Sequence, residues 1–280
     1  MTVLAEITRR KRKEVEALKG RGTLGDLRKK VARLGRKKPV FEKALRKPGK
    51  IAVIAEIKKR SPSAGVLRKN FDPAAIARGY KNAGAAALSV LTDEKFFGGS
   101  SAILKKVRKA VRLPILRKDF IVDEHQVWES RLMGADAILL IAAILPSKKL
   151  AALSAAASAA GLEVLFEVHT RQDLKKVLPL KPRVVGINNR DLRTFKVDIR
   201  TTAKLAGLLP KDILLISESG IQKREDLLYL KKAGAQAILV GESLMKAKNP
   251  GEALRQFSWS PPCLRCSLQR RNPPFMPATS

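Results

Sequence analysis

The chain is poor in cysteine, and its only two cysteines lie close together near the end. Cys263 and Cys266 form a Cys-Leu-Arg-Cys segment, so a disulfide framework is excluded for the rest of the chain. A structural zinc site needs about four ligands, and no second Cys or His pair lies near enough in sequence to supply them. We therefore expect no metal, and we interpret the pair as a chance feature of the tail.

Aromatic residues and long apolar runs are also scarce. Phe, Trp and Tyr make up 5% of the chain, which argues against the stacking platforms of a single-strand nucleic-acid binder. No uninterrupted apolar run reaches the length that a membrane span needs, and the N-terminus has no apolar signal core. These absences predict a soluble, cytoplasmic protein without a membrane partner.

Acidic residues are few relative to basic ones. The chain has 57 Lys and Arg against 25 Asp and Glu, a net charge of +32, which ordinarily raises nucleic acid as a partner. The basic residues recur in helical segments such as Arg9 to Lys13, Lys105 to Lys109 and Lys223 to Lys232, a pattern typical of solvated helix faces. We expect weak, salt-sensitive binding to polyanions and no specific nucleic-acid partner.

Short apolar runs alternate with amphipathic or Ala-rich segments from residue 50 onward. The expected strands are Ile51 to Glu56, Ala86 to Leu91, Pro114 to Lys118, Ala137 to Ile141, Glu163 to Val168, Arg183 to Asn188, Ile213 to Glu218, and Ala237 to Gly241. The expected helices include Pro73 to Ala83, Ser100 to Ala110, Asp123 to Met133, Ser147 to Ala160, Arg171 to Leu178, Gln222 to Ala233, and Ser243 to Gln256. This alternation predicts parallel strands with crossover helices, and eight units predict an α/β fold closed as a (β/α)8 TIM barrel.

One turn recurs three times within this pattern. Ala83-Gly-Ala, Met133-Gly-Ala and Ala233-Gly-Ala each join the end of a helix to a strand. Glycine suits the left-handed position that ends a helix, so the copies predict repeated αβ units. A doubly wound open sheet uses similar turns and is the alternative.

The two ends of the chain differ from the barrel segment. Residues 1–48 embed apolar side chains among Lys, Arg and Glu, which predicts one or two amphipathic helices packed on the barrel as an N-terminal extension. The catalytic barrel is expected over 49–256. Residues 257–280 are rich in Pro, Ser and Arg without apolar periodicity, which predicts a disordered tail.

Polar residues gather where the expected strands end, which is where such barrels place their active sites. Glu56 and Lys58 alternate along the first strand and so project on one face. Burying both costs several kcal/mol unless they pair with each other or with a ligand, and the alternative is a solvated edge strand. Other strands end in Ser89 and Thr92, Lys118 and Asp119, Glu167 and His169, Asn188 and Arg190, and Glu218 and Ser219.

A phosphate site is predicted at the last two strands. Ser219-Gly220 lies beside Gly241-Glu242-Ser243, and glycine at a helix start lets backbone N–H groups approach an anion. The alternative is that Ser243 simply caps its helix.

Seven ordered segments resemble the indole-3-glycerol-phosphate synthase family, from about Leu4 to Gln256. They are Ala55-Glu-Ile-Lys-Lys-Arg-Ser-Pro-Ser63, Leu88-Ser-Val-Leu-Thr-Asp93 with Phe96-Phe-Gly-Gly99, Leu116-Arg-Lys-Asp-Phe-Ile-Val-Asp123, Gly134-Ala-Asp-Ala-Ile-Leu-Leu140, Leu165-Phe-Glu-Val-His169, Gly186-Ile-Asn-Asn-Arg-Asp-Leu192 and Ser217-Glu-Ser-Gly-Ile221. The resemblance implies a carboxy-lyase of tryptophan biosynthesis. Such an enzyme converts 1-(2-carboxyphenylamino)-1-deoxyribulose 5-phosphate into indole-3-glycerol phosphate, CO2 and water, without a metal or organic cofactor.

The resemblance also implies roles for individual residues. Lys118 would be the general acid, Glu167 the general base, and Lys58 the partner of the substrate carboxylate, with a share in the acid role left open. The further substrate-binding residues implied are Glu56, Ser61, Phe97, Asn188, Arg190, Glu218 and Ser219. The phosphate-binding residues implied are Ser61, Gly220, Gly241, Glu242 and Ser243.

Several of these assignments have structural alternatives. Lys118 could pair with Asp119 as a bridge, and Arg190 could form a buried ion pair that supports the pocket. His169 is interpreted as a hydrogen-bonded structural histidine, and the pair Phe96-Phe97 as either substrate cover or loop packing. As an acid, Lys118 would be most effective with its pKa lowered by Lys58, an effect that Glu56 would oppose.

Two rival functions remain at this point. One is another phosphate-binding barrel of the same pathway, such as a phosphoribosylanthranilate isomerase or a tryptophan synthase α-like lyase. The other is a basic barrel that has lost catalysis and binds nucleic acid. The expected partner is a small anionic phosphate substrate, and the expected state is a monomer, with a weak dimer as the alternative.

Overall fold

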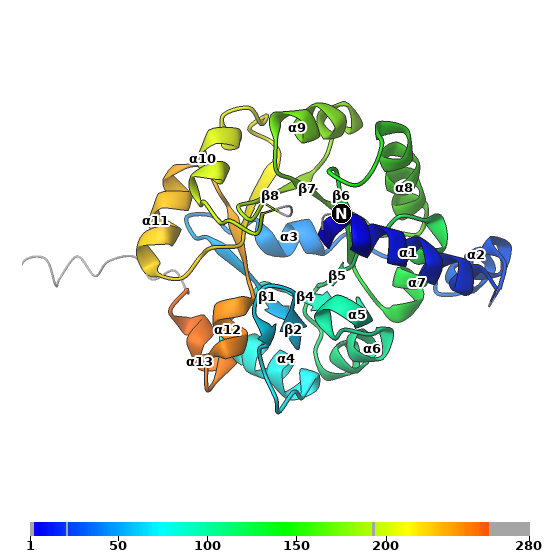
Figure 1. Cartoon of the computed structure of the whole chain (residues 1–280), viewed down its shortest axis with the longest axis horizontal. Helices are drawn as coiled ribbons and strands as arrows, with labels where there is room; N and C mark the ends of the chain where they lie inside the picture. Colours follow the sequence, from blue (N-terminus) through cyan, green and yellow to red (C-terminus); the bar gives the residue numbers. More distant parts are fainter. Residues whose placement is uncertain (1–2, 21, 192–193, 258–280) are drawn as a thin grey trace, which may run out of the picture.

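The computed structural model describes residues 3–20, 22–191 and 194–257. Of the predicted tail over 257–280, only Phe257 is described, and it is buried in the core; the rest, with the two cysteines, lies outside the described residues. Eight parallel strands form a closed barrel in the order β1-β10-β9-β8-β7-β6-β5-β4 (Figure 1). They are β1 (Ala52–Ile57), β4 (Ala87–Leu91), β5 (Ile115–Lys118), β6 (Ala137–Ile141), β7 (Glu163–Val168), β8 (Val184–Asn188), β9 (Leu214–Glu218) and β10 (Ala237–Val240). The predicted TIM barrel is confirmed, and the open-sheet alternative is wrong.

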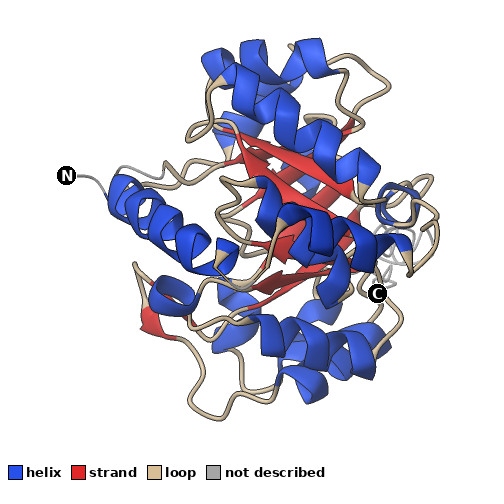
Figure 2. Cartoon of the chain, turned by 90° about the vertical axis from the view of Figure 1, so that its right-hand side faces the viewer, coloured by secondary structure: helices blue, strands red, loops and turns tan. Residues whose placement is uncertain are grey.

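Helices enclose the strands on the outside of the barrel (Figure 2). They are α4 (Pro73–Asn82), α6 (Ser101–Ala110), α7 (Glu124–Met133), α8 (Ser147–Ala159), α9 (Arg171–Val177) with the 3-10 turn η1 (Leu178–Leu180), α10 (Arg200–Ala206), α11 (Arg224–Lys232), α12 (Glu242–Lys246) and α13 (Pro250–Arg255). The three predicted αβ turns are present, because Gly84, Gly134 and Gly234 all have φ between 91° and 95°. None of the helices in the described ranges is long and apolar enough to cross a membrane.

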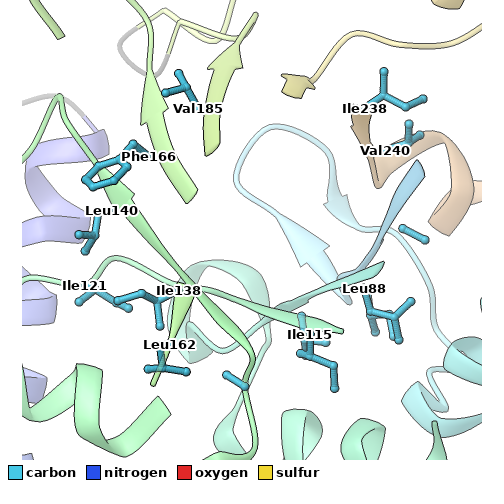
Figure 3. Close-up of a cluster of buried hydrophobic side chains, with 14 of the residues drawn as sticks. Leu88, Ile115, Ile121, Ile138, Leu140, Leu162, Phe166, Val185, Ile238 and Val240 are labelled. Carbon is cyan, nitrogen blue, oxygen red and sulfur yellow. The ribbon is translucent and has the colours of Figure 1, made fainter. Parts of the chain in front are cut away.

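The strands divide the apolar core into two layers. Val53 and Ala55 of β1 belong to the layer between strands and helices, whereas the alternate residue Ile54 belongs to the barrel interior. Figure 3 shows part of the outer layer, where Leu88, Ile115 and Ile138 of successive strands pack together with residues such as Leu162 and Phe166. Because inward and outward side chains alternate, the inward-pointing residue closest to the end of each strand lies at the carboxyl end of the barrel.

Three helices precede the barrel: α1 (Val3–Lys19), α2 (Leu24–Ala32) and α3 (Phe41–Leu45). Helix α3 closes the amino end of the barrel, where Phe41 and Leu45 enter the interior core (Figure 1). The Glu163 carboxylate at the start of β7 accepts the N–H groups of residues 40–42, at 2.7 to 2.8 Å. Helix α1 lies at the other end, where Lys11 contacts Asp93 and Asp119.

Some elements differ from the sequence prediction. The single helix expected from Ser243 to Gln256 is two helices, because Pro250 starts α13 and Asn249 caps it through the N–H of Glu252. Helix α10 was not among the predicted helices. The hairpin of β2 (Arg60–Ser61) with β3 (Gly65–Val66) and the short α5 (Glu94–Phe97) were not predicted either.

Candidate active site

A cavity of about 760 Å³ opens at the carboxyl end of the barrel. Its lining includes every residue predicted for the site: Glu56, Lys58, Ser61, Phe97, Lys118, Glu167, Asn188, Arg190, Glu218, Ser219, Gly220, Gly241, Glu242 and Ser243. These residues are far apart in sequence and meet because each follows or ends a strand of one closed barrel. The structure therefore brings the whole predicted set into one pocket.

An ammonium group between two carboxylates lies at the centre of the cavity. Lys118 ends β5, and its Nζ lies 2.9 Å from Oε2 of Glu167 on β7 and 2.6 Å from Oε2 of Glu218 on β9. Burial alone would lower the pKa of Lys118, but Glu167, Glu218 and Glu56 outweigh it and hold the pKa above its ordinary value. The lowered pKa that would favour Lys118 as an acid is therefore absent, and the lysine is firmly charged.

The two carboxylates beside Lys118 have opposite pKa shifts. Burial acts to raise the pKa of Glu167, but the charges of Lys118 and His169 bring it below its ordinary value. Burial raises the pKa of Glu218 to about 7, because Lys118 offsets the burial incompletely and the neighbouring Glu167 adds repulsion. At neutral pH Glu167 is thus ionised, whereas the raised pKa of Glu218 makes it easier to protonate than an ordinary glutamate.

Glu56 and Lys58 pair with each other across the face of β1. Lys58 Nζ lies 2.6 Å from Glu56 Oε1, and the Glu56 side chain is almost fully buried. The shared face predicted from their spacing is confirmed. The alternative of a solvated edge strand is wrong, because β1 is hydrogen-bonded to β4 and β10 on its two sides.

Asp119 faces away from Lys118, so the predicted alternative of a Lys118–Asp119 bridge is wrong. Its carboxylate lies 2.9 Å from Lys11 Nζ and 3.1 Å from an Arg117 guanidinium nitrogen, and it accepts the Thr92 hydroxyl at 2.5 Å. Consecutive residues at a strand end point to opposite sides, which separates Lys118 from its neighbour.

His169 was expected to be hydrogen-bonded, and this expectation is wrong. Neither ring nitrogen has a hydrogen-bond partner within the described ranges, and both are buried. Nε2 lies 3.7 Å from Glu167 Oε1, on the side of that carboxylate away from the one that meets Lys118.

The predicted phosphate corner contains an unpaired hydroxyl. Ser243 Oγ is buried and has no hydrogen-bond partner among the described residues, and Gly241, not Ser243, occupies the N-cap position of α12. The capping alternative is therefore wrong. Ser219 and Gly220 have φ values of 68° and 78°, two consecutive left-handed residues that turn the chain sharply after β9.

Arg190, which follows β8, meets a carboxylate that follows β10, the second strand along the barrel. A guanidinium nitrogen lies 3.3 Å from Glu242 Oε2 and another 3.5 Å from Ser63 Oγ. The two charged side chains are 24% and 30% exposed, so the pair is accessible and not the buried ion pair weighed from the sequence.

Sequence reasoning missed the apolar wall and two lysines of the cavity. The additional lining residues include Phe120, Leu139, Ile141, Phe195, Val197, Ile199, Lys223 and Lys246. The Phe97 ring lies 6.0 Å from the Phe120 ring, so Phe97 forms part of this wall. Phe120 directly follows Lys118-Asp119, and this position next to a predicted strand end could have marked it as a residue of the cavity. Phe195, Val197 and Ile199 alternate with the polar Lys196 and Asp198, and this period-two pattern was a signal that the sequence reasoning did not use.

No group of three or more His, Cys, Asp or Glu side chains in the described part of the chain is arranged to hold a metal ion.

Comparison with known proteins gives one family over nearly the whole chain. A sequence model described as "Indole-3-glycerol phosphate synthase" matches residues 4–257. Relatives named indole-3-glycerol phosphate synthase are 44% identical over 91% of this chain and 98% of the protein from Acetivibrio thermocellus, and 50% identical over 87% of this chain and 90% of that from Burkholderia vietnamiensis. A third, from Acidithiobacillus ferrooxidans, is 47% identical over 91% of this chain and 98% of its own length.

Solved structures of lower identity share the fold. A thiamine phosphate pyrophosphorylase from Pyrococcus furiosus matches with a TM-score of 0.57 at 15% identity, over 74% of this chain and 93% of its own. An N-acetylmannosamine-6-phosphate 2-epimerase from Clostridium perfringens matches with a TM-score of 0.55 at 18% identity, over 74% of this chain and 91% of its own. At these identities the likeness shows the barrel alone.

Proposed function

Because this chain belongs to the indole-3-glycerol phosphate synthase family, we propose that it forms indole-3-glycerol phosphate from 1-(2-carboxyphenylamino)-1-deoxyribulose 5-phosphate. The reaction closes the five-membered ring, releases CO2 and then eliminates water. The observation that carries the residue roles is the Lys118 ammonium held between Glu167 and Glu218 on three inward-facing strand ends.

Lys118 acts as the proton donor in the ring-closing step. Attack of the aromatic ring on the ketone carbon turns the ketone oxygen into an alkoxide, which needs a proton. The neighbouring carboxylates keep Lys118 charged, so it carries that proton at any pH near neutrality. The substrate's own negative groups and the developing alkoxide then compete with the carboxylates for this ammonium.

Glu167 acts as the proton acceptor, and its basicity depends on Lys118. While Lys118 is charged, the pKa of Glu167 stays below its ordinary value, since that charge opposes the effect of burial. Once Lys118 has given its proton to the substrate, this charge is lost and the pKa of Glu167 rises. The carboxylate therefore becomes a stronger base at the stage where the aromatic system must be restored and water expelled.

The rest of the cavity suits a substrate with a negative charge at each end. Lys58 and Arg190 are the candidate partners of its carboxylate, and the unpaired Ser243 hydroxyl with the backbone of Gly220 and Gly241 suits its phosphate. The Phe97 and Phe120 rings would cover the anthranilate ring. We propose a monomer that works in the cytoplasm, without a cofactor.

Turnover can be followed by the fluorescence of the indole product. We expect activity in the parent, and a fall in kcat of about 10²- to 10⁴-fold in Lys118→Met and in Glu167→Gln, the range that a single proton-transfer group contributes. Both variants should keep the parent's circular dichroism spectrum. No turnover by the folded parent would refute the synthase, whereas a parent-like Lys118→Met would refute only the role of that residue.

A further inference from the structure

Gly186 occupies an inward-facing position of the barrel where its neighbours carry side chains. It lies on β8 between Val184, which belongs to the interior core, and Asn188, which lines the cavity. Strand alternation therefore directs the missing Gly186 side chain into the barrel, just below the active site. Glycine weakens a strand interior, and its presence there often marks the close approach of another group.

The group that approaches Gly186 is the carboxylate of Glu218. A Cβ built on Gly186 would lie 2.1 Å from Glu218 Oε1 and 3.2 Å from Glu218 Cδ, distances at which one of the two groups must move. The next atom, Leu165 Cδ1, is 3.1 Å away and belongs to a flexible side chain. The space that a side chain at 186 would fill is thus already filled by Glu218.

This contact leaves the two oxygens of Glu218 in different surroundings. Oε2 meets Lys118 Nζ at 2.6 Å, whereas Oε1 is buried against Gly186 without a hydrogen-bond partner in the described ranges. A carboxylate oxygen without a donor disfavours the ionised form of the group. Packing against Gly186 therefore fixes the orientation of the Glu218 side chain and shields its Oε1 from solvent.

We propose that Gly186 is a positioning residue, whose bare α-carbon seats the Glu218 carboxylate beside Lys118. The inference rests on the proposed function, because the seated carboxylate acts through the proton donor of that reaction. A second glycine has the same relation to a second carboxylate: a Cβ on Gly241 would lie 2.4 Å from Glu56 Oε1. Gly186 lies on β8, next to the strand β9 of Glu218, and Gly241 directly follows β10, next to the strand β1 of Glu56.

The test is a double-mutant cycle of Gly186→Ala with Glu218→Ala, read by steady-state kinetics and by denaturant unfolding. In the single variant Gly186→Ala, the added methyl group displaces the Glu218 carboxylate toward the open cavity. We expect kcat to fall by about 10²-fold, the cost of displacing a supporting group by about 1 Å, with a smaller change in KM. The pH dependence that Glu218 confers near neutrality should move to lower pH, because the displaced carboxylate is solvated.

In the Glu218→Ala background the same methyl group enters the space that the carboxylate has left. Gly186→Ala should then change neither kcat nor the unfolding midpoint. If Gly186→Ala lowers kcat and the unfolding midpoint equally in both backgrounds, the proposal is wrong. The methyl group would then clash with the strand backbone or with Leu165, and not with Glu218. If Gly186→Ala alone does not fold, a folded double variant supports the proposal and an unfolded one overturns it.

Gly207→Ala is the matched control, because no atom lies within 4 Å of a Cβ at that position and its φ is −65°. It should keep the parent's kcat and unfolding midpoint. If the parent itself does not turn over, the proposed function fails. Denaturant unfolding of the four proteins in the cycle still tests whether Gly186 accommodates Glu218. Failure of this proposal can therefore be told apart from failure of the proposed function.

Discussion

At the scale of single residues, two chemically identical side chains that share one lysine differ in their pKa because their other neighbours differ. Glu167 and Glu218 are both buried and both contact Lys118 Nζ. Glu167 also faces His169, whereas Glu218 has an oxygen against a bare α-carbon. Burial acts to raise both pKa values; Lys118, with His169 nearby, brings that of Glu167 below its ordinary value, whereas Lys118 does not offset the burial of Glu218 and the repulsion from Glu167, so the pKa of Glu218 stays raised. Two carboxylates with separated pKa values are what a reaction needing both a base and a neutral partner requires.

Glu218→Gln should change the pH profile of kcat/KM. The pKa of Glu218 in the ligand-free enzyme is about 7, so its ionisation above that pH adds a negative charge to a cavity that must admit an anionic substrate. We expect kcat/KM of the parent to fall as the pH rises through about 7, since this parameter reports the free enzyme. The variant, which has no charge to gain, should lack this limb. The substrate's own titration affects both proteins equally, so an unchanged limb in Glu218→Gln would contradict the assignment.

Which residues meet in the site could be predicted from the sequence, but how they pair could not. Strand ends are recognisable from apolar runs, and a closed barrel brings all of them together, so the whole predicted set lines the cavity. Pairing depends on side chains from strands far apart in sequence, as with Lys118 and Glu218. A bridge from Lys118 to Asp119 rests on sequence proximity alone, and strand alternation contradicts it. That the His169 ring has no hydrogen-bond partner among the described residues could not be inferred from its neighbours in the sequence.

At the scale of elements, helix α1 is tied to the carboxyl end of the barrel by a buried lysine. Lys11 Nζ lies 3.1 Å from Asp93 Oδ2 and 2.9 Å from Asp119 Oδ1, and all three side chains are at most 5% exposed. Burial would lower the pKa of Lys11, but Asp119 and Asp93 raise it above its ordinary value. Asp119 directly follows Lys118 in the chain, so the same contact supports the strand end that carries Lys118.

Lys11→Met should destabilise the protein by about 3–5 kcal/mol, the cost of leaving buried charges without a partner. The pKa of Asp119 is lowered and that of Lys11 is raised, so the contribution is complete between about pH 4 and about pH 10.5 and declines progressively as the pH falls below or rises above that range toward the folded-state pKa values. Denaturant unfolding of parent and variant at pH 3, 7 and 11 measures it, and the gap should be largest at pH 7. Lys13→Met removes an exposed lysine from the same helix and should be neutral. An equal loss in both variants would point to helix propensity as the cause.

Strands were easier to predict from the sequence than the segments between them. Each predicted strand differs from the observed one by at most a residue at either end, because a short apolar run bounded by polar residues is typical of a strand buried on both faces. Helix α10 was missed since its seven residues, Arg200–Ala206, follow a loop and bury only Thr202 and Leu205. The hairpin β2–β3 has only two residues in each strand, which is too short to give a recognisable sequence pattern. Such a hairpin is not stable alone and depends on the barrel beside it.

At the scale of the whole molecule, the net charge of +32 is distributed over a barrel whose function requires an anionic substrate. The cavity itself contains Lys58, Lys118, Arg190, Lys223 and Lys246 along with several carboxylates. Close pairs inside the cavity cancel one another at short range, so they contribute little to the field beyond it. The many exposed lysines and arginines outside the cavity therefore act on the approach of substrate more than on its chemistry.

Added salt should thus lower kcat/KM and leave kcat unchanged. The positive field raises the encounter rate of an anionic substrate, and salt screens that field over about 10 Å at 0.1 M ionic strength. A steady-state series in KCl measures both parameters. Lys223→Gln removes an exposed charge at the cavity and should give a shallower salt dependence, whereas Lys211→Gln removes one before β9, at the opposite end of the barrel, and should match the parent. A kcat/KM that does not change with salt would exclude steering, and the excess of basic residues would then serve some role other than capture of the substrate.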